Sequence, residues 1–268
     1  MAPSFGRSIS FPLTPGRSSS KPRHVRSVSL PAYTTTSHLN AQIAVVRSLS
    51  HSSLAASLTH IHDLHSSISD ILLLQHPQDA LRRATNLGDR LLDAFLHLAD
   101  AHQGFQECLL DLKHAAAQTS AALRRGDATS AASVMRSQRG ADKKLARLAA
   151  SVSAISSKCA RLNFAGTEDA EMAGALLEAA ATSAAVSAAM FVATASMSSA
   201  SSPSSCNNII SVFGSFGKKF TAETAEQALE RMQALEQCFD ECDAVCDKVF
   251  RSIVHTRVSL LNIMTPTI

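Results

Sequence analysis

The sequence predicts an all-α fold: an elongated antiparallel bundle of four to five long helices that follows a disordered N-terminal arm. Only 4% of the 268 residues are aromatic and none is Trp, whereas Ala, Ser and Leu are abundant, which favours helices over sheets. From about residue 39 onwards, apolar residues recur at spacings of three and four. A hydrophobic fraction of 46% is enough for a substantial core.

The predicted arm, residues 1–36, is rich in Ser, Arg and Pro, and it has too few bulky apolar side chains to offset the entropy lost on ordering. It is also basic. No Asp or Glu occurs between Met1 and His62, and this stretch has a net charge of +6. We therefore expect a disordered basic arm at 1–36 and a helical bundle domain at 37–268, with a linker at about 198–217.

The first helical segment is expected to follow an apolar run from Leu39 to Leu72. The Ser-rich stretch Ser48–Ser53 predicts one break in it. Pro77 predicts its end, because a proline disfavours helix in the residue that precedes it.

The second segment has the clearest periodicity, because its apolar residues keep spacings of three and four from Leu87 to Leu123. A helix of this length is a rod of roughly 55 Å. It is expected to end in the stretch LRRGD (123–127), where Gly126 suits a left-handed C′ position and Asp127 can cap the next helix. The chain is therefore predicted to reverse direction here.

Three more helices complete the predicted bundle. The apolar spacing of Val134–Leu162 predicts a helix that ends near Gly166. The next helix should open after Thr167, where carboxylates in the first turn suit a helix N-terminus. The last helix should cover about Thr221–Ile263.

The helix after Thr167 raises the question of a membrane span, because no charged residue occurs between Glu178 and Lys218. Residues 179–197 are long enough to cross a bilayer, but most of them are Ala, Ser and Thr, which insert weakly. We expect this helix to be buried by close packing of alanines inside the bundle. A membrane-associated protein anchored through 179–197 is the alternative.

Sequence motifs typical of enzymes are missing: the chain contains no GxGxxG, GxxxxGK[ST], HExxH or GxSxG. We therefore expect no enzymatic activity, no catalytic residue and no cofactor.

Cys238, Cys242 and Cys246 share one helix face, but the outer two lie about 12 Å apart along the axis, too far for one tetrahedral zinc ion. We expect these thiols to pack in the core, and the absence of an apolar leader after Met1 favours an intracellular chain with free thiols.

Two other kinds of site are weakly indicated. His60, His62 and His65 have no second ligand pair at a recognisable spacing elsewhere, so we expect solvated or partly buried histidines and no metal. Nucleic acid is not an expected partner, because the arm has no folded recognition element and the bundle is expected to lack a basic face.

The arm repeats the pattern Arg-Ser-x-Ser-x-Pro three times. Basophilic kinases recognise an Arg three residues before the serine, and phosphoserine suits an Arg-lined pocket. The pattern also resembles the ligand of 14-3-3-type phosphoserine readers, in which the peptide turns away at the proline. The candidate phosphorylation and docking residues are Arg7, Ser10 and Pro12, then Arg17, Ser20 and Pro22, then Arg26, Ser29 and Pro31.

The charges of the arm and the last helix are opposite. Three phosphates of about −2 each would cancel the +6 of the stretch from Met1 to His62, whereas residues 221–250 have a net charge of −6. We hypothesise that the unmodified arm associates with an anionic membrane surface or with the acidic helix, and that phosphorylation releases it.

A Ser-rich, acid-free N-terminus is also typical of a plastid or mitochondrial transit peptide. The expected location is cytoplasmic or peripheral to a membrane, with the plastid as alternative, and sequencing the mature N-terminus distinguishes them.

Two stretches carry a family resemblance: HVRSVSLP at 24–31 and VFRSIVHTRVSLLNI at 249–263. Three shorter ones lie between them in the chain, DILLL at 70–74, LLD at 91–93 and LLDLK at 109–113. Together they resemble the plant BYPASS-related (BPS1-like) family. The resemblance implies an all-helical fold, no assigned enzymatic activity and a role in root and shoot development. Within the arm it favours the third copy, RSVSLP, and therefore Ser29.

Overall fold

A computed structural model of the chain describes residues 32–48, 53–160, 168–198 and 222–265. The chain divides into two compact units, Met1–Leu30 and Pro31–Ile268, and all described residues belong to the second. They contain helices and no strand, which confirms the all-α prediction. The helices are α1 (Ala32–Arg47), α2 (Leu54–Leu72), α3 (Gln75–Arg83), α4 (Thr85–Arg124), α5 (Ala128–Ala160), α6 (Glu168–Ser198) and α8 (Ala222–Met264).

The predicted boundaries of the first helices were partly correct. The break near Ser48–Ser53 is confirmed, because α1 ends at Arg47 and α2 begins at Leu54, with Ser53 Oγ accepting a hydrogen bond from Ala56 N at 3.1 Å. The helix α1, however, begins at Ala32, so the last residues assigned to the arm are helical. Most of the predicted arm, and the predicted linker apart from Ser198, lie outside the described residues.

The prediction that the first segment ends at Pro77 was wrong. Helix α2 ends at Leu72, and Pro77 lies in the first turn of a separate short helix, α3, which begins at Gln75. The first N–H groups of a helix have no carbonyl partner within it, so a proline there removes no hydrogen bond. Pro77 is therefore accommodated in the first turn of a helix here and does not stop one.

The reversal between α4 and α5 has the geometry that the stretch LRRGD predicts. Gly126 has a φ of +70°. Its N–H donates to Leu123 O at 3.0 Å, and the N–H of Asp127 donates to Ala122 O at 2.9 Å, the two bonds of a Schellman motif. The Asp127 carboxylate then accepts from Ser130 N at 3.0 Å and caps α5.

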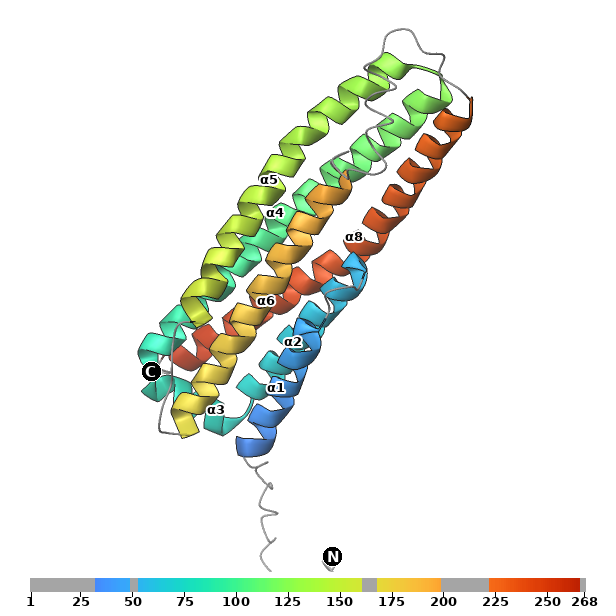
Figure 1. The fold of residues 1–268 in the computed structure, drawn as a ribbon. Helices are drawn as coiled ribbons and strands as arrows, with labels where there is room; N and C mark the ends of the chain where they lie inside the picture. Colours follow the sequence, from blue (N-terminus) through green and yellow to red (C-terminus); the bar gives the residue numbers. More distant parts are fainter. Residues whose placement is uncertain (1–31, 49–52, 161–167, 199–221, 266–268) are drawn as a thin grey trace, which may run out of the picture. The chain divides into compact units, whose positions relative to one another are not determined.

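The long helices run side by side in alternating directions (Figure 1). Helix α4 packs between α5 and α8 and is antiparallel to both, and α6 packs against α5. Helices α1 and α2 flank only the half of the bundle that contains α3, where both contact α6 and α2 also contacts α8. Ion pairs between helices match this register: Lys144 with Glu107 at 2.8 Å, Arg83 with Asp169 at 2.7 Å, and Lys113 with Asp240.

Helix α6 lies inside this arrangement. Among the described residues it is the one helix whose length and hydropathy would allow a membrane crossing, but 72% of its most apolar window is buried in the bundle. Many of its buried residues are small, which lets neighbouring helices approach closely. They include Ala173, Ala179, Ala180, Ala181 and Ala184, beside the larger Met172, Leu176 and Phe191.

Gly126 and Gly140 make a matched pair for testing the turn. A Cβ atom added to either glycine would meet no atom within 4 Å, but only Gly126 has a positive φ. Gly126→Ala should therefore lower the free energy of unfolding by about 1 kcal/mol, because a side chain disfavours the left-handed conformation. Gly140→Ala, in the interior of α5, should raise it by about 0.5–1 kcal/mol. Urea unfolding of both variants measures this, and equal effects would contradict the assignment of the turn.

Candidate functional site

The residues that were predicted from the sequence to be phosphorylated or to dock partners all belong to the first 31 residues. Ser10, Ser20 and Ser29, with their arginines and prolines, therefore lie outside the part of the chain that the structure describes. Candidate sites in the described part are the acidic helix α8, the buried cysteines and histidines, a groove beside α1, and the surface of α5.

Helix α8 carries the predicted acidic stretch, and the bundle engages part of it. Four carboxylates bind neighbouring side chains: Glu236 accepts from Ser120 Oγ at 2.7 Å and Asp240 pairs with Lys113. Within α8, Asp247 pairs with Arg251 at 2.8 Å and Glu241 accepts from Gln237 Nε2 at 3.2 Å. Glu226, Glu230 and Glu241 are exposed. This half of α8 therefore presents an anionic surface to the solvent.

The cysteines of the described residues lie in helices, and most of them are in the core. Cys108, Cys159, Cys242 and Cys246 are buried and Cys238 is half-buried, and all five are free thiols. Burial raises the pKa of every one of them, that of Cys246 to about 12. Within the described ranges no three potential ligands approach closely enough to hold a metal ion. Such thiols are protonated at neutral pH and behave as small apolar side chains.

Two buried histidines were not foreseen as a pair. His65 of α2 and His102 of α4 both hydrogen-bond to serines of α6, His65 Nε2 to Ser183 Oγ and His102 Nε2 to Ser187 Oγ, each at 2.9 Å. All four side chains are almost completely buried. We call these residues the His–Ser layer. It joins α6 to α2 and to α4.

Aromatic rings complete the surroundings of the His–Ser layer. The ring of His65 stands edge-on to Phe95, and that of His102 edge-on to Phe191, with centroids 5.5 Å apart in both pairs. Phe191 also stacks on Phe105 at 4.7 Å. The histidines therefore serve as core residues with one polar contact each.

The electrostatics of the His–Ser layer follow from burial. Desolvation, helped by the nearby His102 and His62, lowers the pKa of His65 to about 3. Desolvation alone lowers the pKa of His102 to about 4. Both rings are consequently neutral at physiological pH, and neither is poised as a general base. The expectation that His65 is solvated or partly buried was wrong, whereas His60 and His62 are half-buried.

A second buried contact joins α2 to α8. Ser69 Oγ lies 3.1 Å from Thr256 Oγ1, and Ser69 also donates to the backbone oxygen of His65 at 3.0 Å. Thr256 belongs to the C-terminal stretch that carries the family resemblance. Its position shows that this stretch packs against α2.

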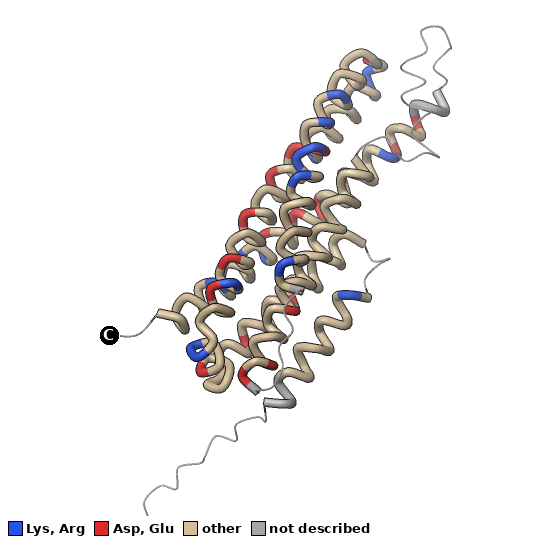
Figure 2. The backbone as a smooth tube through the Cα atoms, turned by 60° about the vertical axis from the view of Figure 1, so that its left-hand side comes forward, with Lys and Arg blue, Asp and Glu red and all other residues tan. Residues whose placement is uncertain are grey.

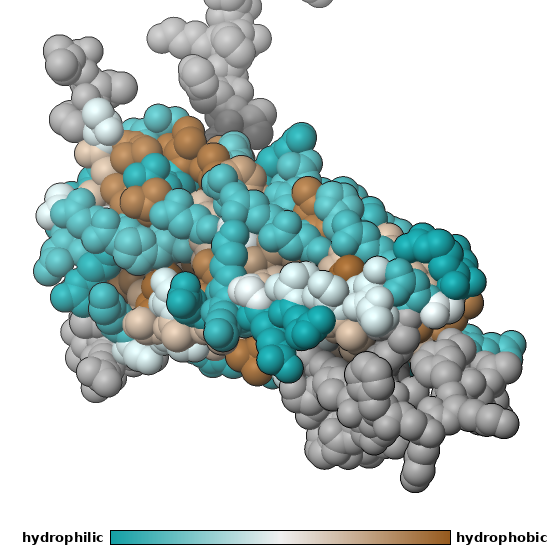
Figure 3. All heavy atoms as spheres, turned by 90° about the horizontal axis from the view of Figure 1, so that it is seen from above, coloured by the Kyte–Doolittle hydropathy of each residue, from teal (hydrophilic) through white to brown (hydrophobic). Residues whose placement is uncertain are grey.

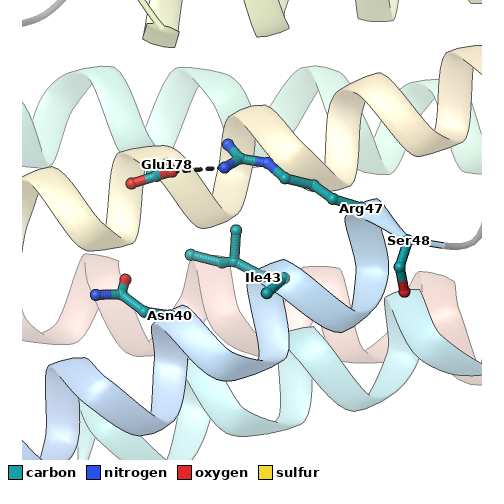
Figure 4. A pocket seen from close by; sticks show the side chains of 6 residues that line it. Asn40, Ile43, Arg47, Ser48 and Glu178 are labelled. Carbon is teal, nitrogen blue, oxygen red and sulfur yellow. Dashed lines mark ion pairs between the residues drawn. The ribbon is translucent and has the colours of Figure 1, made fainter.

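A shallow groove of about 580 Å³ lies between α1 and α6 (Figure 4). Arg47 of α1 pairs with Glu178 of α6 across it at 2.8 Å, while Asn40, Ile43 and Ser48 line the α1 side. Both charged side chains are about half exposed. The ion pair already satisfies the two charges, so the groove presents no uncompensated charge to a ligand.

The surface of α5 contradicts the expectation that the bundle lacks a basic face. Four exposed cations recur along α5 at spacings of three, four and four: Arg136, Arg139, Lys143 and Arg147. We call them the basic row. In Figure 2, Lys and Arg recur along the half of α5 nearest its turn with α4. Seen from above, hydrophilic residues dominate the bundle surface and hydrophobic ones form small areas (Figure 3).

Comparison with known proteins identifies a family. A family model described as Protein BPS1 matches residues 57–263. No curated protein and no solved structure matches the chain. The matched range begins in α2 and ends in α8, so it covers most of the bundle and leaves α1 outside.

The His–Ser layer predicts a pH dependence of stability. The unfolded chain binds protons to His65 and His102 near pH 6.5, while the folded chain does so only near pH 3 to 4. Between these values the unfolded state holds more protons, so the free energy of unfolding falls as pH falls, by up to about 1.4 kcal/mol per pH unit for each histidine.

Urea unfolding from about pH 6.5 to about pH 5, above most carboxylate titration, isolates this effect. His65→Gln combined with His102→Gln should flatten the dependence. The matched control, His97→Gln with His114→Gln, changes two exposed histidines of α4 and should keep it. Equal slopes in the two double variants would contradict the assignment.

Proposed function

Because the chain belongs to the family described as Protein BPS1, we propose that it is a non-enzymatic helical interaction protein in plant root and shoot development, controlled through its N-terminal arm. The family model spans residues 57–263, and this match is the observation that carries the developmental role. The arm, which is the regulatory element in this proposal, lies before the matched range.

The chemistry of the buried groups supports a role without catalysis. A nucleophilic thiol needs a lowered pKa, and a general base needs a pKa near the working pH. Here burial raises the pKa of the thiols, and it lowers those of His65 and His102 to about 3 and 4. The buried thiols and imidazoles are therefore held in their neutral forms, in which they act as packing side chains.

The arm supplies the regulation in this proposal. Ser10, Ser20 and Ser29 each follow an Arg by three residues and precede a Pro by two. The arm is cationic, so before modification it favours anionic surfaces. Three phosphates of about −2 each cancel its charge and create ligands for Arg-lined pockets such as those of 14-3-3-type readers. Phosphorylation thus exchanges one class of partner for another. No nucleic acid is required, and the protein would be cytoplasmic or peripheral to a membrane.

A second candidate is a membrane-associated protein anchored through residues 179–197. The length and hydropathy of α6 favour it. Against it stands the cost of removing α6 from the bundle, which would leave His65 and His102 without their serine partners. The two candidates differ in where α6 finds apolar surroundings, inside the bundle or in a bilayer.

Replacing the three serines tests the first candidate. The full chain with Ser10→Ala, Ser20→Ala and Ser29→Ala should lose the partners that phosphatase treatment removes from the wild type, because no phosphoserine remains for a reader. The measurement is affinity recovery from plant cells with and without phosphatase, followed by identification of the bound proteins.

The arm offers a matched control in the first serine of each repeat. Ser8→Ala, Ser18→Ala and Ser27→Ala also remove three hydroxyls, but these serines follow the Arg directly. This control should retain the phosphatase-sensitive partners. Recovery of the same partners from both triple variants would show that these partners do not depend on phosphorylation of Ser10, Ser20 and Ser29.

A further inference from the structure

We propose that the basic row of α5 is a docking surface for the anionic headgroups of a membrane. The inference goes beyond the proposed function, because it uses neither the arm nor its phosphorylation. Arg136, Arg139, Lys143 and Arg147 are spaced so that they share one helix face, over about 16 Å from first to last. None of the four forms an ion pair with another described residue.

The surroundings leave the charge of the row largely uncancelled. The single carboxylate of α5, Asp142, accepts a hydrogen bond from Ser198 of α6, and burial raises its pKa. On the other flank, Glu107 of α4 is paired with Lys144, which is not part of the row. Helix α6 carries no charged residue between Glu178 and its end at Ser198.

The helix register places uncharged surface beside the row. The contact between Asp142 and Ser198 aligns the C-terminal end of α6 with the middle of α5. Exposed residues at this end of α6 include Ala193, Ser196 and Met197, and Met197 is 40% exposed. The part of the row near Lys143 and Arg147 is therefore bordered on the α6 side by uncharged surface that neither repels an anionic membrane nor competes for the cations.

The linear arrangement of the four cations favours a flat anionic membrane surface over other anionic partners. A phosphoserine pocket needs cations that converge on one group, whereas these four lie in a line on the outer face of a helix. Single-stranded nucleic acid is held by aromatic side chains that stack on bases, and α5 contains no aromatic residue. A bilayer that contains anionic lipids presents many headgroups in one plane and attracts each Lys or Arg near its surface.

Vesicle flotation with the full, unphosphorylated chain tests the proposal. The wild type should float with vesicles of phosphatidylcholine and phosphatidylserine but not with phosphatidylcholine alone, and added salt should weaken the binding. Arg139→Gln with Lys143→Gln should bind about 25-fold more weakly, at about fivefold for each cation removed.

A control with the same change of net charge separates the row from the overall charge. Arg90→Gln with Lys248→Gln removes two exposed cations on α4 and α8 that form no ion pair in the described residues, and it should bind nearly as the wild type does. The basic arm is identical in both variants, so it cannot produce a difference between them. Urea unfolding checks that both remain folded.

Four results would overturn the proposal. The first is a wild-type chain that does not bind phosphatidylserine vesicles, and the second is an equal loss of binding in both double variants. The third is a loss of binding to homopolymeric RNA in the Arg139 and Lys143 variant while vesicle binding persists, since it would identify a nucleic-acid surface. The fourth is a change of oligomeric state in place of vesicle binding, since it would identify an interface between copies. None of these results depends on Ser10, Ser20 or Ser29, so the proposed function is tested separately.

Discussion

The burial of α6 is the constraint on which the rest of the structure depends. A helix with no charge between Glu178 and Ser198 must find apolar surroundings, and here α2, α4, α5 and, in the half that contains α3, α1 supply them. Its alanines let these neighbours approach closely, while Phe191 fills the space against Phe105. The two contacts of the His–Ser layer fix the position of α6, because a slip along the axis would separate buried polar groups from their partners.

That constraint divides the molecule into an inert interior and a charged exterior. Inside, neutral histidines and protonated thiols are packing elements, since burial disfavours their charged forms. Outside, charge is sorted by helix: carboxylates face the solvent on α8 and unpaired cations do so on α5. In the proposed function, the charged surfaces of the bundle and the basic arm are therefore the regions that would contact partners.

The parts of the fold that local sequence determines could be predicted. Alternating spacings of three and four located α4 and α5, and Gly126 and Asp127 identified the turn between them, because these signals depend on neighbouring residues alone. Pro77 misled the prediction, since a proline can stop a helix or occupy its first turn, and only the neighbouring contacts decide. The burial of His65 depends on Ser183, 118 residues away, and no local pattern reports such a partner. The basic row could have been found from the spacing of Arg136, Arg139, Lys143 and Arg147 once α5 was assigned.

Hydrogen exchange of α6 amides in the full chain tests the central claim most directly. If α6 is a core helix of the bundle, the amides from Met172 to Phe191 should be among the slowest to exchange in aqueous solution, and adding phosphatidylcholine vesicles should not change their rates. Exchange as fast as that of a frayed terminus, with protection only when vesicles are present, would contradict the account and place α6 in a bilayer.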